Sequence, residues 1–229
     1  MTVYAILNES SAPELTHPYL LETAVDMQVA YDRDYAAACA VLPIDIVVCD
    51  RPEDVPEKAR VFHIMDSIPE APGALAFHTR DDSGRPVLKI GVDENRKEAL
   101  ATGGSFLDAL TESMSHEIFE TARNPYVNRW ISGPWLDKKV ADEASDPVQG
   151  SPYREGQTAI SNFTLPAWSD PEDLVGPWDF GGVLKSPFDC APTGYLPFDD
   201  GTNQYGEAVS ARKREHLETY GRFARAKAA

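Results

Sequence analysis

A histidine and two glutamates near the middle of the chain have the spacing of a metal-binding helix. Residues 115–120 read Ser-His-Glu-Ile-Phe-Glu, so His116 and Glu120 are four positions apart and Glu117 lies between them. An α-helix advances about 100° per residue, so side chains four apart project from one face. HExxH zinc peptidases present two histidine ligands in this way, with the intervening glutamate as general base. Here a carboxylate replaces the second histidine.

That replacement changes the expected metal chemistry. Zinc accepts a carboxylate oxygen at about the same distance as an imidazole nitrogen, so Glu120 can serve as a ligand. The added negative charge lowers the Lewis acidity of the ion, and oxygen ligands also admit manganese or iron. We therefore expect zinc as the cofactor, with weaker catalysis than at an HExxH site. The alternative is a solvated helix face on which His116 and Glu120 form an ion pair worth a few tenths of a kcal/mol.

A third ligand has to come from elsewhere in the chain, and an acidic cluster follows about one loop later. Residues 141–147 read Ala-Asp-Glu-Ala-Ser-Asp-Pro. We predict a short helix over residues 138–145, and on such a helix Glu143 and Asp146 would both face one point. One of them, with Glu143 slightly favoured, would ligate the metal, and the other would orient His116 through its second ring nitrogen. The alternative is an exposed acidic turn.

The helix that carries these residues is predicted over residues 106–122. Ser105 is a plausible N-cap, and Asn124-Pro125 ends the helix. Its large apolar side chains cluster within about 120° of arc and form a core-facing stripe: Phe106, Leu107, Leu110, Met114 and Ile118. His116 and Glu120 fall about 130° from the centre of that stripe. The pair therefore faces an environment separate from the hydrophobic core.

The remaining patterns predict an α+β domain with a mixed sheet. Short apolar or β-branched runs predict strands at residues 3–7, 44–49 and 60–65, and a hairpin joins residues 73–79 to 86–92 through a turn at Gly84. Helical periodicity over residues 18–41 predicts a long first helix, interrupted near Asp32.

The character of the sequence changes after Pro125. All four tryptophans and most glycines follow, which predicts an irregular lobe rich in proline and aromatic residues, with a charged C-terminal helix over about residues 207–227. We divide the chain into a subdomain at residues 1–125 and a lobe at 126–229 that completes the metal site, together forming one compact unit.

Composition narrows the classes of partner. The 229 residues carry a formal net charge of −16, which repels nucleic acid and anionic lipid surfaces. The three cysteines, Cys39, Cys49 and Cys190, lie far apart and do not suggest a disulfide framework. The N-terminus lacks the basic region of a signal peptide, and no apolar run approaches the roughly 20 residues that span a bilayer. These features predict a cytoplasmic protein, and they leave its oligomeric state open.

Several motifs together resemble a known group of proteins. Ser115-His116-Glu117-xx-Glu120-xxx-Asn124-Pro125, followed by Glu143-xx-Asp146-Pro147, is similar to the SHExxE…NP…ExxDP pattern of bacterial and phage-associated proteins regarded as zincin-like metallopeptidases. Further matches lie at residues 76–78, 84–86, 160–168 and 192–195, so the resemblance covers about residues 74–196. EXORDIUM-type phosphate-induced proteins share a similar but more distant pattern. The resemblance implies a zincin-like fold and hydrolysis of peptide or protein substrates.

In the catalytic interpretation, Glu117 takes a proton from the water that attacks an amide carbonyl. The strand at residues 73–79 would align an extended peptide by backbone pairing. We expect His78 to cap a strand rather than reach the site. The side chains that could supply an oxyanion donor are Tyr153, Tyr195 and His216, and the alternative for each of them is a structural role.

Two other functions compete with a hydrolase. One is a non-catalytic structural or phage-particle-associated protein in which a metal ion only stabilises the irregular lobe. The other is a binding protein that uses the aromatic lobe for carbohydrate or peptide and needs no metal. Bound metal and peptide cleavage, measured separately, distinguish the three.

Overall fold

The computed structural model describes residues 1–133, 137–173, 175–209 and 211 of the chain. Two compact units are present and each is described by itself: unit 1 comprises Met1–Val127 and Pro152–Ser161, and unit 2 comprises Asn128–Ser151 and Asn162–Ala229. The first boundary lies two residues from the predicted division at 125/126. Residues 152–161, placed by the sequence analysis in the second part, belong to unit 1. Most of the predicted C-terminal helix, including His216, lies outside the described residues.

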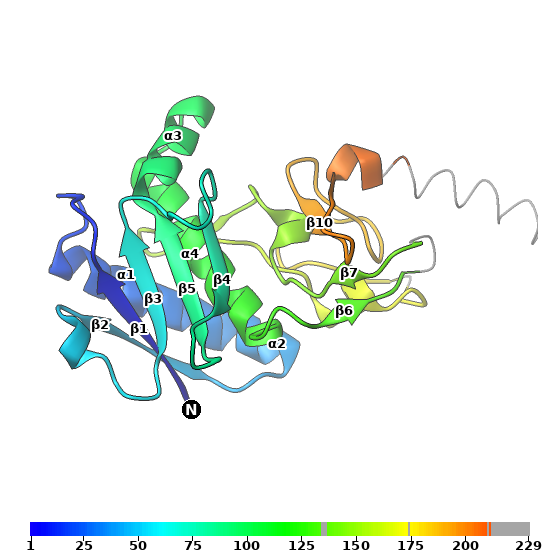
Figure 1. The fold of residues 1–229 in the computed structure, drawn as a ribbon. Coiled ribbons are helices and arrows are strands. Elements are labelled where there is room, and N and C mark those ends of the chain that lie inside the picture. Colours follow the sequence, from blue (N-terminus) through cyan, green and yellow to red (C-terminus); the bar gives the residue numbers. More distant parts are fainter. Residues whose placement is uncertain (134–136, 174, 210, 212–229) are drawn as a thin grey trace, which may run out of the picture. The chain divides into compact units, whose positions relative to one another are not determined.

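Unit 1 is built on a five-stranded mixed sheet with the order β2-β1-β3-β5-β4 (Figure 1). Its strands are β1 (Thr2–Asn8), β2 (Ile44–Cys49), β3 (Arg60–Met65), β4 (Ala76–Arg80) and β5 (Pro86–Gly91). Four of them run parallel, and β4 pairs antiparallel with β5 at one edge. The strands predicted at 44–49 and 60–65 are confirmed with the same bounds. The predicted hairpin is confirmed too, with Gly84 at a φ of 82° in its turn.

The long N-terminal helix is confirmed and extends over 23 residues in three segments. These are α1 (His17–Ala30), the π-helix η1 (Tyr31–Ala36) and α2 (Ala37–Cys39). The interruption predicted near Asp32 is this change of helical pitch. Thr16 caps the N-terminus by accepting a hydrogen bond from the backbone of Tyr19. No helix in the described part of the chain is long and apolar enough to cross a membrane.

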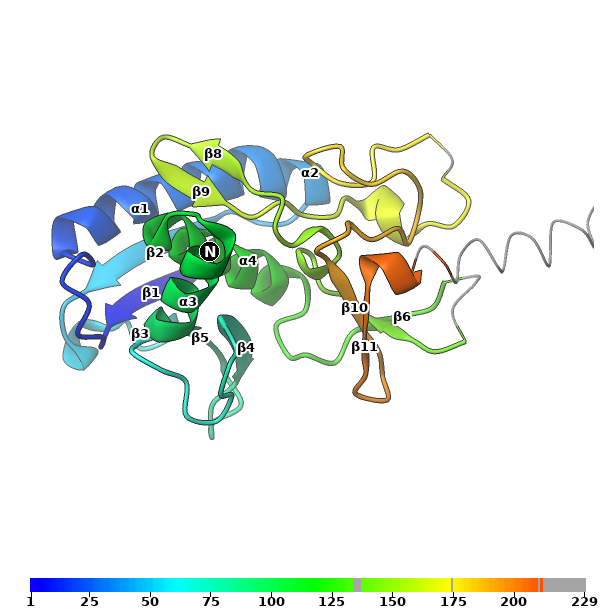
Figure 2. The same cartoon turned by 90° about the horizontal axis from the view of Figure 1, so that it is seen from above.

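Helix α4 (Phe106–Arg123) carries the HExxE sequence, and its predicted extent is confirmed to within one residue. The Ser105 side chain caps it by accepting from the backbone N–H of Asp108. Helices α1 and α4 lie on the same face of the sheet (Figure 2). The hairpin of β8 (Tyr153–Glu155) and β9 (Thr158–Ile160) packs against both helices.

One helix was not predicted. Residues 92–102 form α3 (Val92–Thr102), which packs against α4. Only Val92, Asn95 and Ala99 of this helix are buried, and Leu100 is exposed. Because these few buried positions give no apolar stripe, hydrophobic periodicity did not reveal the helix. The 3-10 helix η2 (Pro52–Asp54) lies in the loop between β2 and β3.

A buried asparagine connects α3, α4 and the start of the β4–β5 hairpin. The Asn95 side-chain amide donates to the backbone oxygens of Leu75 (2.9 Å) and Gly91 (2.8 Å). Its side-chain oxygen accepts from the Ser113 hydroxyl of α4 at 2.8 Å. A buried amide needs all of these partners, so the network fixes where α4 lies relative to the edge strand β4.

Unit 2 consists of short elements around an aromatic core. Its strands and 3-10 helices are β6 (Trp130–Ile131), β7 (Val140–Ala141), η3 (Asp146–Val148), η4 (Pro166–Ser169), β10 (Tyr195–Pro197) and β11 (Asn203–Tyr205). The core includes Trp168 and Phe188, whose ring centroids are 5.3 Å apart. The short helix predicted over residues 138–145 is wrong, because Val140 and Ala141 are buried and pair with β6 instead.

Candidate metal centre

Residues 115–121, in the second half of α4, are all buried. His116 is 9% exposed, and Glu117 and Glu120 are each 4% exposed. A histidine and two carboxylates at this depth need compensating partners, because an isolated buried charge costs several kcal/mol. The alternative of a solvated helix face carrying an incidental ion pair is therefore wrong.

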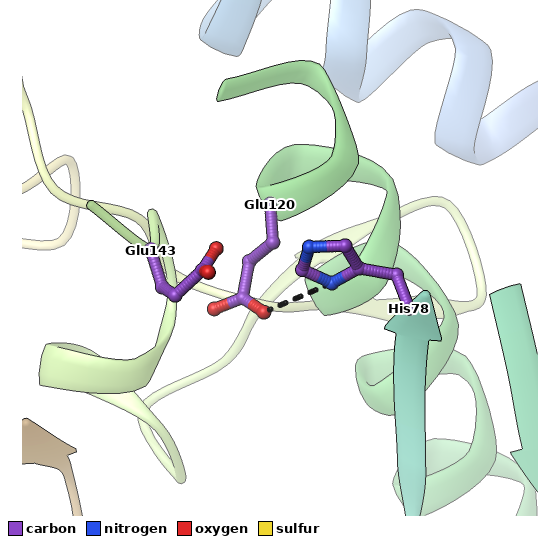
Figure 3. Close-up of side chains that lie close together, drawn as sticks. All are labelled: His78, Glu120 and Glu143. Carbon is purple, nitrogen blue, oxygen red and sulfur yellow. Dashed lines mark ion pairs between the residues drawn. The ribbon is translucent and has the colours of Figure 1, made fainter. Parts of the chain in front are cut away.

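Glu120 lies between two imidazoles. Its Oε1 is 3.0 Å from Nε2 of His116 on the same helix. Its Oε2 is 3.8 Å from Nδ1 of His78 on β4, and Figure 3 shows this pair. The same His78 nitrogen is 3.0 Å from Oε2 of Glu117. We call these four residues, His78, His116, Glu117 and Glu120, the His–Glu cluster. All four belong to unit 1.

His78 is the member of the cluster that sequence reasoning missed. It was expected to cap a strand, but it is 9% exposed and its ring lies against both glutamates. Within β4, His78 is buried whereas its neighbours Phe77 and Thr79 are half-buried, and the strand contacts α4. What the sequence did not show is that this strand lies over α4, since that contact depends on strand order and not on local pattern.

The C-terminal end of α4 is held by side-chain donors from other elements. The Tyr35 hydroxyl donates to the Phe119 backbone oxygen at 2.9 Å, and an Arg60 guanidinium nitrogen donates to that of Thr121 at 3.0 Å. The Tyr35 ring also stacks on Phe119, with centroids 4.7 Å apart. Burial raises the pKa of Tyr35 well above that of a free phenol, which keeps it a neutral donor. These contacts fix the helix turn that carries Glu120.

The serine that begins the motif has a structural role. The Ser115 hydroxyl donates to the Thr111 backbone oxygen at 2.9 Å and accepts from the backbone N–H of Ser161 at 2.8 Å. It thereby joins α4 to the segment that follows β9. Two of the sequence motifs, at residues 115–120 and 160–168, are thus connected by one buried hydroxyl.

Glu143 and Asp146 lie in unit 2, in a buried stretch that runs from the end of β7 into η3, which begins at Asp146. They are 5% and 3% exposed. The preceding Asp142 forms an ion pair with Arg129 at 2.8 Å, and the Ala144 oxygen accepts from the backbone N–H of Thr164 at 2.7 Å. The alternative of an exposed acidic turn is therefore wrong.

A glycine shapes the end of that stretch. A Cβ on Gly194 would lie 2.4 Å from the Pro147 backbone oxygen, so no other residue fits without a shift of the backbone. The motif at residues 192–195 therefore packs directly against the Asp146-Pro147 motif. The two carboxylates are held on a fixed backbone within unit 2.

The donor chemistry fits a divalent metal ion. His78, His116 and Glu120 of unit 1, and Glu143 and Asp146 of unit 2, belong to the buried histidine and carboxylate groups that could hold one. Two ligands of a tetrahedral zinc ion, each bonded at about 2.0–2.1 Å, lie about 3.3 Å apart. The separations of 3.0 and 3.8 Å around Glu120 bracket that value. The nitrogen and oxygen donors suit zinc, manganese and iron alike.

The three candidate oxyanion donors are not equivalent. Tyr153 donates its hydroxyl to Asp34 at 3.1 Å, within unit 1. Tyr195 lies on β10 with its ring against Tyr205, within unit 2. His216 lies outside the described residues. Tyr153 therefore has a structural partner of its own.

Comparisons with known proteins assign no function to this site. No protein-family model, curated protein or solved structure matches this chain. The function proposed below therefore depends on the residues, their burial and their distances.

Proposed function

We propose that this chain is a metal-dependent hydrolase, a zincin-like metallopeptidase that uses zinc. The observation that carries the proposal is the buried His–Glu cluster, in which the HExxE glutamate Glu120 lies 3.0 Å from His116. Burying this set of ionisable groups costs free energy of folding. Such clusters are therefore typical of sites that bind a ligand or carry out chemistry. The α+β topology, with an antiparallel edge strand over the site helix, is the arrangement expected of a zincin-like fold.

His116 and Glu120 would be the two ligands from the helix. Glu143 or Asp146, contributed by unit 2, would supply the third, and the ordered backbone of that stretch supports this role. When bound, the ion would supply Lewis acidity that polarises the substrate carbonyl and makes the attacking water more acidic. The carboxylate ligands would reduce this effect relative to a histidine-rich site.

Glu117 would act as the general base. Its carboxylate accepts a proton from water as the water oxygen bonds to the amide carbon. The same proton is then given to the amide nitrogen as the carbon–nitrogen bond breaks, so the products are a carboxylic acid and an amine. Its 4% exposure keeps bulk water from competing for the carboxylate.

The edge strand β4 would align the substrate. It pairs with β5 along one side, so its other edge can pair with an extended backbone, a common mode of peptide recognition. His78 on this strand lies beside Glu117, which would bring a peptide bond held along β4 close to the base. This supports peptides or proteins as the substrate class.

A metal-stabilised structural protein is the second candidate. The observation that favours it is the stretch of residues 141–148, which is buried throughout but has little regular secondary structure. An ion could stabilise such a segment without any turnover. Phage-particle association would be compatible with that role.

Three variants distinguish the two functions. Bound metal is measured by elemental analysis, and cleavage is measured on a mixed peptide library. We expect Glu117→Gln to retain metal and to lose about 10²–10⁴-fold in activity, the range for a general base. His116→Ala should lose both metal and activity. Glu98→Gln, on the exposed face of α3, is the matched control and should change neither. Metal binding without cleavage by any form would support the structural protein, and a metal-free, fully stable wild type would refute both.

A further inference from the structure

We propose that the His–Glu cluster holds a second divalent cation, with Glu120 bridging the two ions and His78 ligating the second. The proposal depends on the metal site of the proposed function but not on its catalysis. It starts from the two oxygens of Glu120, which face different imidazoles: Oε1 faces His116 and Oε2 faces His78. A carboxylate placed in this way is suited to bridge two cations.

The ring of His78 has the orientation of a metal ligand. Its Nε2 lies 3.2 Å from the Asn124 backbone oxygen, and a carbonyl oxygen can only accept, so Nε2 carries a proton. Metal-ligating histidines usually donate their second ring nitrogen to such a partner, which fixes the tautomer and aims the other nitrogen at the ion. In His78 that other nitrogen is Nδ1, the atom that faces the two glutamates.

A proton or a metal cation must lie between Nδ1 of His78 and the carboxylates of Glu117 and Glu120. In the neutral ring, the Nδ1 lone pair would face carboxylate oxygens at 3.0 Å (Glu117) and 3.8 Å (Glu120). Lone pairs repel at these distances unless a proton or a cation lies between them. A proton would make His78 an ion-pair partner of Glu117, and a cation would make it a ligand. The experiment below distinguishes these occupants.

Charge balance favours the cation. With Glu143 and Asp146 as proposed ligands, the site would hold four buried carboxylates and two imidazoles. One dication together with a proton on His78 would leave one of the four negative charges uncompensated in a buried site, whereas two dications would neutralise all four. Hydrolases with two metal ions about 3.5–4 Å apart use this kind of centre to hold both the attacking and the leaving oxygen. Glu117 remains outside the ligand set and keeps its role as base.

The test counts ions in the whole chain. The purified metal-free protein is titrated with Zn²⁺, followed by elemental analysis after gel filtration, and separately with Mn²⁺, followed by electron paramagnetic resonance. We expect two equivalents of either ion in the wild type, and an exchange-coupled Mn²⁺ spectrum. His78→Ala should bind one equivalent and give an uncoupled spectrum, and His63→Ala, a surface histidine paired with Glu9, should bind two.

One equivalent in the wild type, or two in His78→Ala, would overturn the proposal and leave the proton as the occupant. If His78→Ala does not fold, the wild-type count and the coupled spectrum decide alone. The outcome is separable from that of the proposed function. Two bound ions without peptide cleavage would refute the hydrolase and uphold the second cation, and cleavage with one ion would do the reverse.

Discussion

The glutamate that replaces the second histidine of an HExxH motif does more than change one ligand atom. A histidine offers one nitrogen to one ion, whereas Glu120 offers two oxygens, and these face His116 and His78 separately. The same substitution adds a negative charge to a site that already contains Glu117. Under the proposed function, the departure of this single residue from the HExxH pattern would favour more positive charge at the centre, and not loss of the metal.

This argument predicts the effect of restoring the histidine. Glu120→His would provide an imidazole for the ion at His116 but would remove the bridge and one negative charge. We expect the variant to bind a single Zn²⁺ equivalent where the wild type binds two, measured by elemental analysis after dialysis. Glu98→His, on the exposed face of α3 and away from the cluster, is the control and should keep the wild-type count. An unchanged count of two in Glu120→His would show that Glu120 does not bridge.

Local sequence patterns correctly predicted those strands and helix ends whose formation depends on residues close together in the chain. The strands at 44–49 and 60–65 were predicted within their observed bounds because each is a short run of mostly apolar residues that includes β-branched ones. The start of α4 was predicted because Ser105 caps it. The site helix and its four-residue spacing were therefore predictable from sequence alone.

Elements that depend on distant contacts were not predictable in this way. The α3 helix has no apolar stripe, and its polar residue Asn95 is buried only because Leu75, Gly91 and Ser113 satisfy it. Residues 140 and 141 form a strand because β6 pairs with them, although a short helix was predicted over residues 138–145. His78 reaches the glutamates through the order of the sheet. In each case a non-local partner decides the outcome.

The end of the N-terminal helix offers a test of local conformation. Ala40 ends α2 with a φ of 52°, in the left-handed region, which costs an L-residue about 1–2 kcal/mol. Glycine adopts this conformation freely but loses more backbone entropy on folding. We expect Ala40→Gly to stabilise the protein by about 0.5–1 kcal/mol in urea unfolding. Ala38→Gly, in the helix two residues earlier, should destabilise it by about 1 kcal/mol. Equal effects at both positions would contradict the assigned helix end.

At the scale of the whole molecule, acidic charge and buried phenols determine how stability responds to pH. The net charge of −16 opposes folding into a compact state at neutral pH because like charges repel. The net charge becomes more negative as lysines lose their protons above about pH 10. Unit 1 also buries Tyr4 and Tyr35 completely, and burial raises the pKa of both. Both effects therefore act against folding in alkaline solution, and they can be separated by substituting a single phenol.

We predict that the contribution of the Tyr35 hydroxyl to the free energy of unfolding disappears in alkaline solution. An unfolded tyrosine loses its proton near pH 10, whereas folded Tyr35 keeps it, so its stabilisation is complete below pH 10 and is lost as pH rises towards the folded pKa. Tyr35→Phe removes the hydrogen bond to the Phe119 oxygen and should cost about 1 kcal/mol at pH 8. Because phenylalanine does not ionise, that deficit should shrink or reverse by pH 11 in urea unfolding. The background repulsion is the same in both proteins, and Tyr126→Phe, at an exposed phenol, controls for the loss of one hydroxyl. A deficit that is constant from pH 8 to pH 11 would show that Tyr35 ionises as freely in the folded protein as in the unfolded chain.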